Sequence, residues 1–277
     1  MLPRGAALAR GRFRSAPEST VTCATQFRWT SAACTDVGLV RERNEDACFD
    51  APERGIWAVA DGMGGHAVGD FASRTIVQAL EAMPPAQELD DAVATARTTL
   101  QAVNQVLIDE AARMQVRVIG STVVALMACE RRCACLWAGD SRLYLYRDGH
   151  LKQLTRDHSQ VERLRARGLI TAEQARRHPA HNTITRAVGA AASLSLEDLQ
   201  VEIGDGDMFL LCSDGLSNEV EDPAIAEAMA CGDCASAARE LVDLALANGG
   251  HDNVSVIVIR AEDIGGGSDR TLLNPEV

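Results

Sequence analysis

The stretch GIWAVADGMGGH, residues 55–66, joins an apolar run to a turn that contains one carboxylate, three glycines, a methionine and a histidine. A short apolar run bounded by turn residues is typical of a buried strand. This run ends at Asp61, where a strand of the core would be expected simply to turn. The stretch therefore predicts a core strand that carries a carboxylate at its end, and the rest of the sequence has to explain that carboxylate.

The overall composition is that of one globular unit, or at most two, since 47% of the 277 residues are apolar and 24% are charged. No run approaches the ~18 to 20 apolar residues that a membrane helix needs, so we expect no membrane span. The formal net charge of −12 argues against a nucleic-acid-binding protein. Residues 1–28 hold five arginines and one glutamate, so the remainder is more acidic still, and clustered acids attract cations.

The two ends of the sequence differ from its body. Residues 1–25 are rich in Arg, Ala and Ser; they could be a transit-like or anionic-surface segment, but we interpret them as a basic, disordered extension. Residues 263–277 are expected to be a flexible, Gly-rich tail, which leaves one folded domain over residues 26–262. Nine cysteines in a chain of this length predict reduced, buried thiols and a cytoplasmic protein, and we interpret the CxxC pair Cys231 and Cys234 as core residues.

Apolar runs of strand length recur along the whole body and are bounded by Gly, Asp or Asn. Residues 142–154 predict a hairpin that turns at Asp148–Gly149, and most runs are consecutive, which favours antiparallel pairing. The strand candidates are residues 25–34, 47–50, 55–60, 121–129, 132–139, 142–155, 195–203, 207–212 and 253–260.

Two helical zones interrupt these strands. The first runs from about residue 70 to 114 with a break at Pro84–Pro85, and its second half repeats apolar residues at three- and four-residue steps. The second covers residues 223–229 and 236–247 and stops at Asn248–Gly249–Gly250. Many strands with helices in pairs predict an α+β fold: a central antiparallel β-sandwich of two sheets flanked by pairs of helices.

Residues 159–186 form a different kind of segment. Capping boxes from Ser159 to Glu162 and from Thr171 to Gln174 predict two short helices. The segment holds six arginines and two glutamates, so it is a basic surface in an acidic protein. This surface is either a solvated helical face or a contact for an anionic substrate.

Aspartates stand at the ends of the apolar runs. A single Asp–Gly is only a turn, but several carboxylates at the ends of neighbouring core strands repel one another unless a proton or a cation neutralises them. Ligands that are all oxygens select hard ions such as Mg²⁺ or Mn²⁺, and these acids are too far apart in the sequence for a calcium loop. The residues concerned are Asp46, Asp61, Asp140, Asp214 and Asp252.

Eight motifs follow one another between about residues 30 and 260: GLVRERNEDA, VADGMGGHAVG, GSTVV, AGDSRLY, LTRDHS, ITRAVG, LCSDGL and GGHDNVSVIVI. In this order and spacing, the sequence resembles the metal-dependent protein phosphatase family, the type 2C serine/threonine phosphatases, in its compact bacterial form. The resemblance implies a β-sandwich flanked by helix pairs, with a binuclear Mn²⁺ or Mg²⁺ centre at one end. It also implies that a small helical flap, about residues 158–186, lies beside the active site and influences the choice of protein substrate.

The resemblance implies a set of metal ligands by motif position. Asp61 bridges the two ions, the Gly62 carbonyl and Asp46 complete the protein shell of one ion, and Asp214 and Asp252 hold the other. Glu45 acts through metal-bound water. Similar bacterial members bind a third, weaker ion, for which Asp140 with Asp214 is the matching pair.

The reaction that the resemblance implies is the hydrolysis of a phosphomonoester by a metal-activated water, which attacks phosphorus in line without a covalent enzyme intermediate. Arg41 matches the family's phosphate-binding arginine, and a guanidinium fork suits two phosphate oxygens; the alternative is an ordinary surface arginine. Some members carry a histidine directly after the Asp–Gly pair as a general acid. Here that position is Met63, which cannot transfer a proton, so the proton comes through water or from His66 at a shifted position.

We therefore expect a cytoplasmic, monomeric protein phosphatase acting on phosphoserine and phosphothreonine, which opposes a cognate Ser/Thr kinase and has forkhead-associated or secretion-system proteins as further candidate partners. An alternative is a catalytically inactive phosphoprotein-binding module on the same fold, for which the loss of a core aspartate would be the expected mark; none is lost. A third possibility is an unrelated metal-binding regulatory protein without phosphatase activity.

Overall fold

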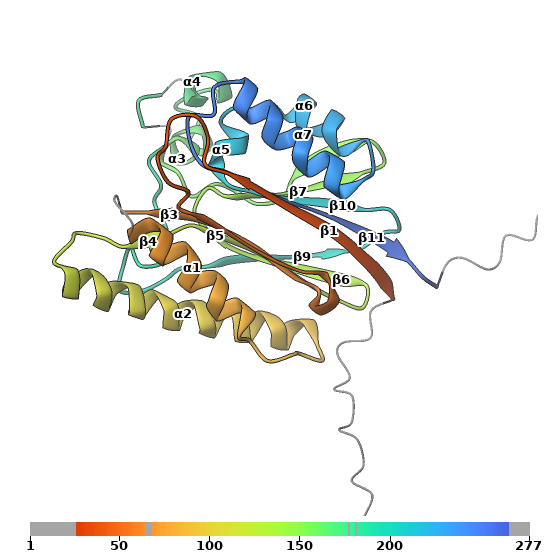
Figure 1. Ribbon diagram of the computed structural model, residues 1–277, viewed down its shortest axis with the longest axis horizontal. Helices are drawn as coiled ribbons and strands as arrows, with labels where there is room; N and C mark the ends of the chain where they lie inside the picture. Colours follow the sequence, from red (N-terminus) through yellow and green to blue (C-terminus); the bar gives the residue numbers. More distant parts are fainter. Residues whose placement is uncertain (1–25, 65–67, 177, 181, 266–277) are drawn as a thin grey trace, which may run out of the picture.

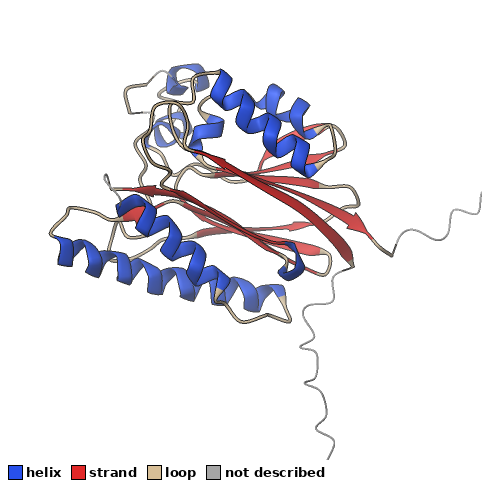
Figure 2. Cartoon of the chain, viewed as in Figure 1, coloured by secondary structure: helices blue, strands red, loops and turns tan. Residues whose placement is uncertain are grey.

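Two antiparallel sheets stack face to face in the middle of the molecule, with helices on both outer faces (Figures 1 and 2). This arrangement confirms the predicted α+β sandwich with flanking helix pairs. The predicted extension and most of the predicted tail lie outside the described part of the chain. The structure is a computed structural model and describes residues 26–64, 68–176, 178–180 and 182–265.

The first sheet has five strands in the order β1-β11-β10-β7-β8. Helix α7 packs on its outer face, where Leu241 and Val242 belong to the same buried apolar cluster as Leu210 and Val258 of the strands. The strands are β1 (Phe27–Asp36), β7 (Arg142–Arg147), β8 (His150–Gln153), β10 (Met208–Cys212) and β11 (Val254–Asp263). The helices on this side are α5 (Asp214–Ser217), α6 (Asp222–Met229) and α7 (Cys234–Ala247).

The second sheet has the order β2-β3-β5-β6-β9, and the short β4 pairs with β3. Two long helices cover its outer face, and the predicted apolar stripe of the second helix is buried there at Ala96, Leu100 and Leu107. The strands are β2 (Asp46–Ala51), β3 (Ile56–Met63), β4 (Gly120–Ser121), β5 (Val123–Cys129), β6 (Arg132–Ala138) and β9 (Glu197–Glu202). The helices are α1 (Val68–Glu81) and α2 (Leu89–Met114), and the 3-10 turn η1 is Pro52–Arg54.

No helix in the described part of the chain is long and apolar enough to cross a membrane.

Strand β3 shows why residues 56–60 are apolar at every position. Trp57 and Val59 face the other sheet, whereas Ala58 and Ala60 face the helices. A strand covered on both faces does not alternate between apolar and polar residues. The small alanines let α1 pack close to the sheet, while Trp57 fills the space between the two sheets.

The local turn signals of the sequence are confirmed. Asp148 and Gly149 have φ values of 52° and 77°, as a type I′ hairpin turn between β7 and β8 requires. The helices of the basic segment are α3 (Gln160–Ala166) and α4 (Ala172–Arg176). Glu162 N donates to Ser159 Oγ at 3.3 Å, and Gln174 N donates to Thr171 Oγ1 at 3.2 Å, so both predicted caps are present.

The cysteines correct one prediction. Cys129 is disulfide-bonded, so the prediction of reduced thiols is wrong for this residue. It is the last residue of β5, where the strand leaves the sandwich, whereas Cys133 and Cys135 lie between the sheets. Free thiols are present at Cys34, Cys48, Cys133, Cys135, Cys212, Cys231 and Cys234.

Candidate metal centre

Two of the predicted aspartates lie on neighbouring strands of the second sheet. Asp46 is the first residue of β2, and it is paired in register with Asp61 near the end of β3. Thr122 N donates to the Asp61 carbonyl at 2.8 Å, and Asp61 N donates to Thr122 Oγ1 at 3.1 Å, which fixes this end of β3. The fold therefore places two carboxylates directly opposite each other, an arrangement that costs stability unless a cation intervenes.

The other three aspartates come from the ends of strands in both sheets. Asp214 follows the end of β10, and Asp252 precedes the start of β11, so the antiparallel pairing of these strands brings both to one end of the first sheet. Asp140 lies in the link from β6 to β7, which crosses from the second sheet to the first. Asp140, Asp214 and Asp252 line one cavity of about 730 Å³.

The ionisation of these groups shows that they share one environment. Burial, and after it the neighbouring carboxylates, raise the pKa of Asp46 to about 7 and that of Asp214 to about 6. The pKa values of Asp61 and Asp140 also lie well above the ordinary range, first because of burial and then because of the neighbouring aspartates. The ionised form of these four acids is therefore disfavoured in the empty site, and a bound cation would stabilise it.

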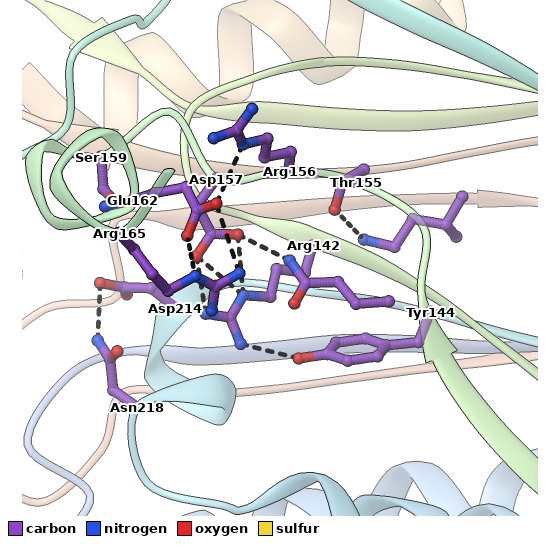
Figure 3. Close-up of polar contacts among 12 residues, drawn as sticks. Arg142, Tyr144, Thr155, Arg156, Asp157, Ser159, Glu162, Arg165, Asp214 and Asn218 are labelled. Atoms are coloured by element: carbon purple, nitrogen blue, oxygen red, sulfur yellow. Dashed lines mark hydrogen bonds and ion pairs between the residues drawn. The ribbon is translucent and has the colours of Figure 1, made fainter. Parts of the chain in front are cut away.

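The carboxylate oxygens fit a hard divalent cation. Both side-chain oxygens of Asp46 and Oδ1 of Asp214 are buried and have no hydrogen-bond partner. Buried acceptors without partners are costly, and oxygen-only ligands suit Mg²⁺ or Mn²⁺. Within the described residues, no three Asp, Glu, His or Cys side chains already form a compact ligand cluster. The second oxygen of Asp214 accepts from Asn218 Nδ2 at 3.1 Å (Figure 3).

Gly62 is required by a close approach of the backbone. A Cβ at Gly62 would lie 2.1 Å from the Gly69 carbonyl oxygen of α1, so no side chain fits there. Gly62 N donates to the Glu45 carbonyl at 3.1 Å, and the Glu45 carbonyl also accepts from Ser73 Oγ at 2.6 Å. A Cβ at Gly69 would lie 2.7 Å from Glu45 Oε2, so Glu45 is held against the start of α1, directly before Asp46.

Arg41 also lies at this site. Its Nη2 is 2.6 Å from Asp252 Oδ2, and Arg41 lines the same cavity as Asp140 and Asp214. The side chain is 55% exposed, so its guanidinium can reach a ligand from the solvent side. The structure thus brings Arg41 to the aspartates, where the sequence alone left open an ordinary surface arginine.

Asn253 is a residue of the site to which the sequence analysis assigned no role. Its Nδ2 donates to the carbonyls of Val37 and Arg43 at 2.8 and 2.9 Å, and its Oδ1 accepts from Glu45 N at 2.8 Å. Asn253 therefore holds the loop that carries Arg41. The only available signal was its place between Asp252 and an apolar strand, which does not reveal partners over 200 residues away.

Met63 and His66 are the two positions considered for proton transfer to the leaving group. Met63 pairs with Gly120 in the short ladder between β3 and β4, so it belongs to the strand and not to the turn. His66 lies outside the described residues. Its two candidate roles, a direct proton donor or a residue that orders water, remain predictions.

The sequence matches a family model. The model described as protein phosphatase 2C matches residues 40–247 of this chain. The serine/threonine protein phosphatase PstP of Mycobacterium tuberculosis is 36% identical over 249 residues, which cover 87% of this chain and 47% of that protein. This chain therefore spans about half the length of the mycobacterial relative. The serine/threonine phosphatase stp of Listeria monocytogenes is 33% identical over 240 residues, which cover 82% of this chain and 94% of that protein.

Solved structures resemble this chain over similar lengths. A structure described as PppA, a key regulatory component of T6SS in Pseudomonas aeruginosa, has a TM-score of 0.80 and 43% identity, and the match covers 87% of this chain and 100% of that chain. The catalytic domain of PstP in complex with two manganese ions has a TM-score of 0.77 and 36% identity, with 86% of this chain and 100% of that chain covered.

Proposed function

The chain belongs to the protein phosphatase 2C family, and we propose that it is a metal-dependent phosphatase that hydrolyses phosphoserine and phosphothreonine in proteins. The observation that carries this proposal is the convergence of Asp46, Asp61, Asp140, Asp214 and Asp252, with Arg41, at one end of the sandwich. A site of buried carboxylates with one guanidinium at its rim suits a phosphate monoester held between cations and an arginine.

We propose that the centre takes two Mn²⁺ or Mg²⁺ ions. The proposed ligands are Asp46, Asp61, the Gly62 carbonyl, Asp214 and Asp252. The buried oxygens of Asp46 and Asp214 that have no hydrogen-bond partner support this assignment. When bound, such ions lower the pKa of a coordinated water and neutralise charge on the phosphoryl oxygens. The manganese ions in the PstP structure support a binuclear centre. A third ion held by Asp140 with Asp214 is a further proposal, supported by their shared cavity.

The residues of this chain would bind and orient the substrate. Arg41 is proposed to bind two phosphate oxygens through its guanidinium fork, leaving Asp252 when the substrate arrives. Glu45, fixed by Asn253 and Ser73, is proposed to act on water at the centre. The leaving alkoxide would take its proton from water, or from His66 if that side chain reaches the site.

The proposed substrates are phosphorylated proteins, and the proposed opposing enzyme is a Ser/Thr kinase in a cytoplasmic signalling pathway. Forkhead-associated and secretion-system proteins are proposed as further partners. The description of the Pseudomonas structure, which is 43% identical, as a regulatory component of T6SS supports a secretion-linked role. The flap is proposed to select protein substrates, since Glu162 and Arg165 line the cavity from α3. If replacing Arg163, Arg165 and Arg167 by alanine leaves the ratio of phosphoprotein to p-nitrophenyl phosphate turnover unchanged, this flap proposal is wrong.

Metal dependence tests the proposed function. Purified protein should hydrolyse p-nitrophenyl phosphate and a phosphothreonine peptide when Mn²⁺ is added and should lose this activity in EDTA. Activity that survives EDTA, or Mn²⁺ binding without turnover of either substrate, would reject the proposal. The second result would favour the inactive binding module, although all five aspartates are present.

A further inference from the structure

Arg142 and Asp157 form an ion pair on the wall of the cavity that also contains Asp140 and Asp214. Arg142 Nη2 donates to Asp157 Oδ2 at 2.7 Å, and Arg142 Nε donates to Asp157 Oδ1 at 3.0 Å (Figure 3). This two-pronged geometry fixes both side chains relative to each other. The side chains are only 22% and 15% exposed, so water screens the pair weakly.

Two neutral side chains complete the hydrogen bonds of the pair. Arg142 Nη1 donates to the Tyr144 hydroxyl at 2.9 Å, and Gln153 Nε2 donates to Asp157 Oδ1 at 2.9 Å. Within the described residues, the side-chain hydrogen bonds of Arg142 go to Asp157 and Tyr144, and none goes to Asp140. The guanidinium is therefore held on Asp157, although carboxylates of the metal centre line the same cavity.

Both partners lie beside carboxylates of the proposed metal centre. Arg142 lies two residues after Asp140 in the sequence. Arg142 and Asp157 line the same cavity of about 730 Å³ as Asp140 and Asp214. A positive charge in this cavity attracts the two carboxylates, and the negative charge of Asp157 offsets that attraction.

The pair is not needed to join the two segments that carry it. His158 N donates to the Gly139 carbonyl at 2.9 Å, and Leu143 N donates to Thr155 Oγ1 at 3.0 Å. These bonds connect the same two segments on either side of the pair. Loss of one charge would therefore leave the segments connected, which separates an electrostatic role of the pair from a purely structural one.

We propose that Asp157 is a positioning residue for the metal centre: it neutralises Arg142 and keeps that guanidinium off Asp140 and Asp214, so that these carboxylates stay available to a divalent cation. Without the charge of Asp157, Arg142 carries an uncompensated positive charge beside the site and competes with the cation for both carboxylates. The inference rests on the proposed function, since it concerns the cations of that centre.

The variant Asp157→Asn tests this inference, because asparagine keeps the size of the side chain and one acceptor oxygen but removes the charge. The readout is the Mn²⁺ affinity of the full chain, followed by the electron paramagnetic resonance signal of free Mn²⁺, which needs no turnover. We expect Asp157→Asn to weaken Mn²⁺ binding about tenfold. The double variant Asp157→Asn with Arg142→Gln should recover most of that loss, because it removes both charges.

The pair of Arg147 and Asp207 provides a matched control. It lies at the other end of β7, Arg147 Nε donates to Asp207 Oδ1 at 2.6 Å, and Asp207 is 1% exposed. Asp207→Asn should lower the thermal stability and leave the Mn²⁺ affinity unchanged. This contrast separates damage to an ion pair from an effect on the metal centre.

Two results would overturn the inference while leaving the metal centre in place. They are equal Mn²⁺ affinity in the wild type and Asp157→Asn, or a folded double variant that binds Mn²⁺ no better than the single variant. A wild-type chain that binds no Mn²⁺ would instead overturn the proposed metal centre, and this inference with it.

Discussion

Asp46 and Asp61 lie directly opposite each other across the ladder that joins β2 to β3. Opposed like charges on adjacent strands destabilise a sheet, and burial makes their repulsion stronger. Both oxygens of Asp46 are buried without a hydrogen-bond partner, so the polypeptide alone does not satisfy them. The opposed pair therefore costs the metal-free fold stability, and a cation bound at the proposed site would remove that cost.

The first prediction concerns this pair. Asp46→Asn removes one of the opposed charges at nearly constant volume, so the protein in EDTA should become more stable by about 1–2 kcal/mol. Phosphatase activity with Mn²⁺ should fall at least about 100-fold, since a ligand is lost. Thermal unfolding in EDTA and initial rates with Mn²⁺ measure the two effects. Asp50 is exposed on the same strand, so Asp50→Asn should change neither the stability in EDTA nor the activity with Mn²⁺. An Asp46→Asn protein that is less stable than the wild type in EDTA would contradict this prediction.

The second prediction concerns pH. In the folded, metal-free protein Asp46 and Asp214 have pKa values of about 7 and about 6, whereas the ordinary value is 3.8. The folded state therefore holds more protons than the unfolded state between about pH 4 and pH 7, and the free energy of unfolding decreases as the pH rises through this window. The melting temperature in EDTA should therefore fall with rising pH, by about 2–4 °C for each kcal/mol by which the free energy of unfolding decreases.

Mn²⁺ should reverse this trend, because it binds the deprotonated carboxylates and stabilises the folded state most at the high end of the window. Asp46→Asn serves as the control, since it should flatten the pH dependence in EDTA. A melting temperature in EDTA that stays constant or rises over the window would show that the aspartates are not coupled as described.

The third prediction concerns Asn253, which holds the loop of Arg41 with three hydrogen bonds of 2.8 to 2.9 Å. Asn253→Ala should cost about 2–4 kcal/mol of stability, because it leaves three part-buried backbone groups without their side-chain partner. It should also raise KM for p-nitrophenyl phosphate, since Arg41 is no longer held in place. Asn248→Ala removes an exposed bond of 2.8 Å to the Glu219 carbonyl and should cost less than about 1 kcal/mol, with KM unchanged. Equal effects of the two variants would contradict this role of Asn253.

The fourth prediction concerns Arg41 itself. Arg41→Ala should raise KM for p-nitrophenyl phosphate about tenfold or more, because a charge-assisted contact to phosphate is lost. Its Mn²⁺ affinity should not decrease, since Arg41 is paired with Asp252 in the ligand-free site. Arg43→Ala, two residues along the same loop, is the control and should leave KM unchanged. An unchanged KM in Arg41→Ala would show that Arg41 does not bind the phosphate.

Much of the fold could be predicted because the apolar runs are long and clearly bounded. The prediction was less accurate at Asp61 to Met63, which the sequence indicates as a turn but which continue β3. Their partners, Asp46 and Gly120, are supplied by other strands and cannot be recognised from local turn residues. Helix α5 was not predicted, because four residues are too few to show a helical period.

The aspartates could be identified from the sequence because each stands at one end of an apolar run, and the ends of neighbouring strands lie close together in a sheet. The residues that support the site, Asn253 and Asp157, could not be identified in this way. Asn253 contacts a loop that lies more than 200 residues earlier in the sequence, and Asp157 contacts Arg142 across a hairpin. Their side chains are ordinary polar residues in the sequence, and only the packing of distant segments gives them their partners.

We propose that Asp214 belongs to a metal centre that hydrolyses phosphate esters of serine and threonine. The most direct test is phosphate release from a phosphothreonine peptide by the wild type and by Asp214→Asn, each with Mn²⁺ and with EDTA. We expect rapid release only by the wild type with Mn²⁺, and a rate at least about 100-fold lower for the folded variant. Equal release by the two proteins, or release by the wild type in EDTA, would contradict it.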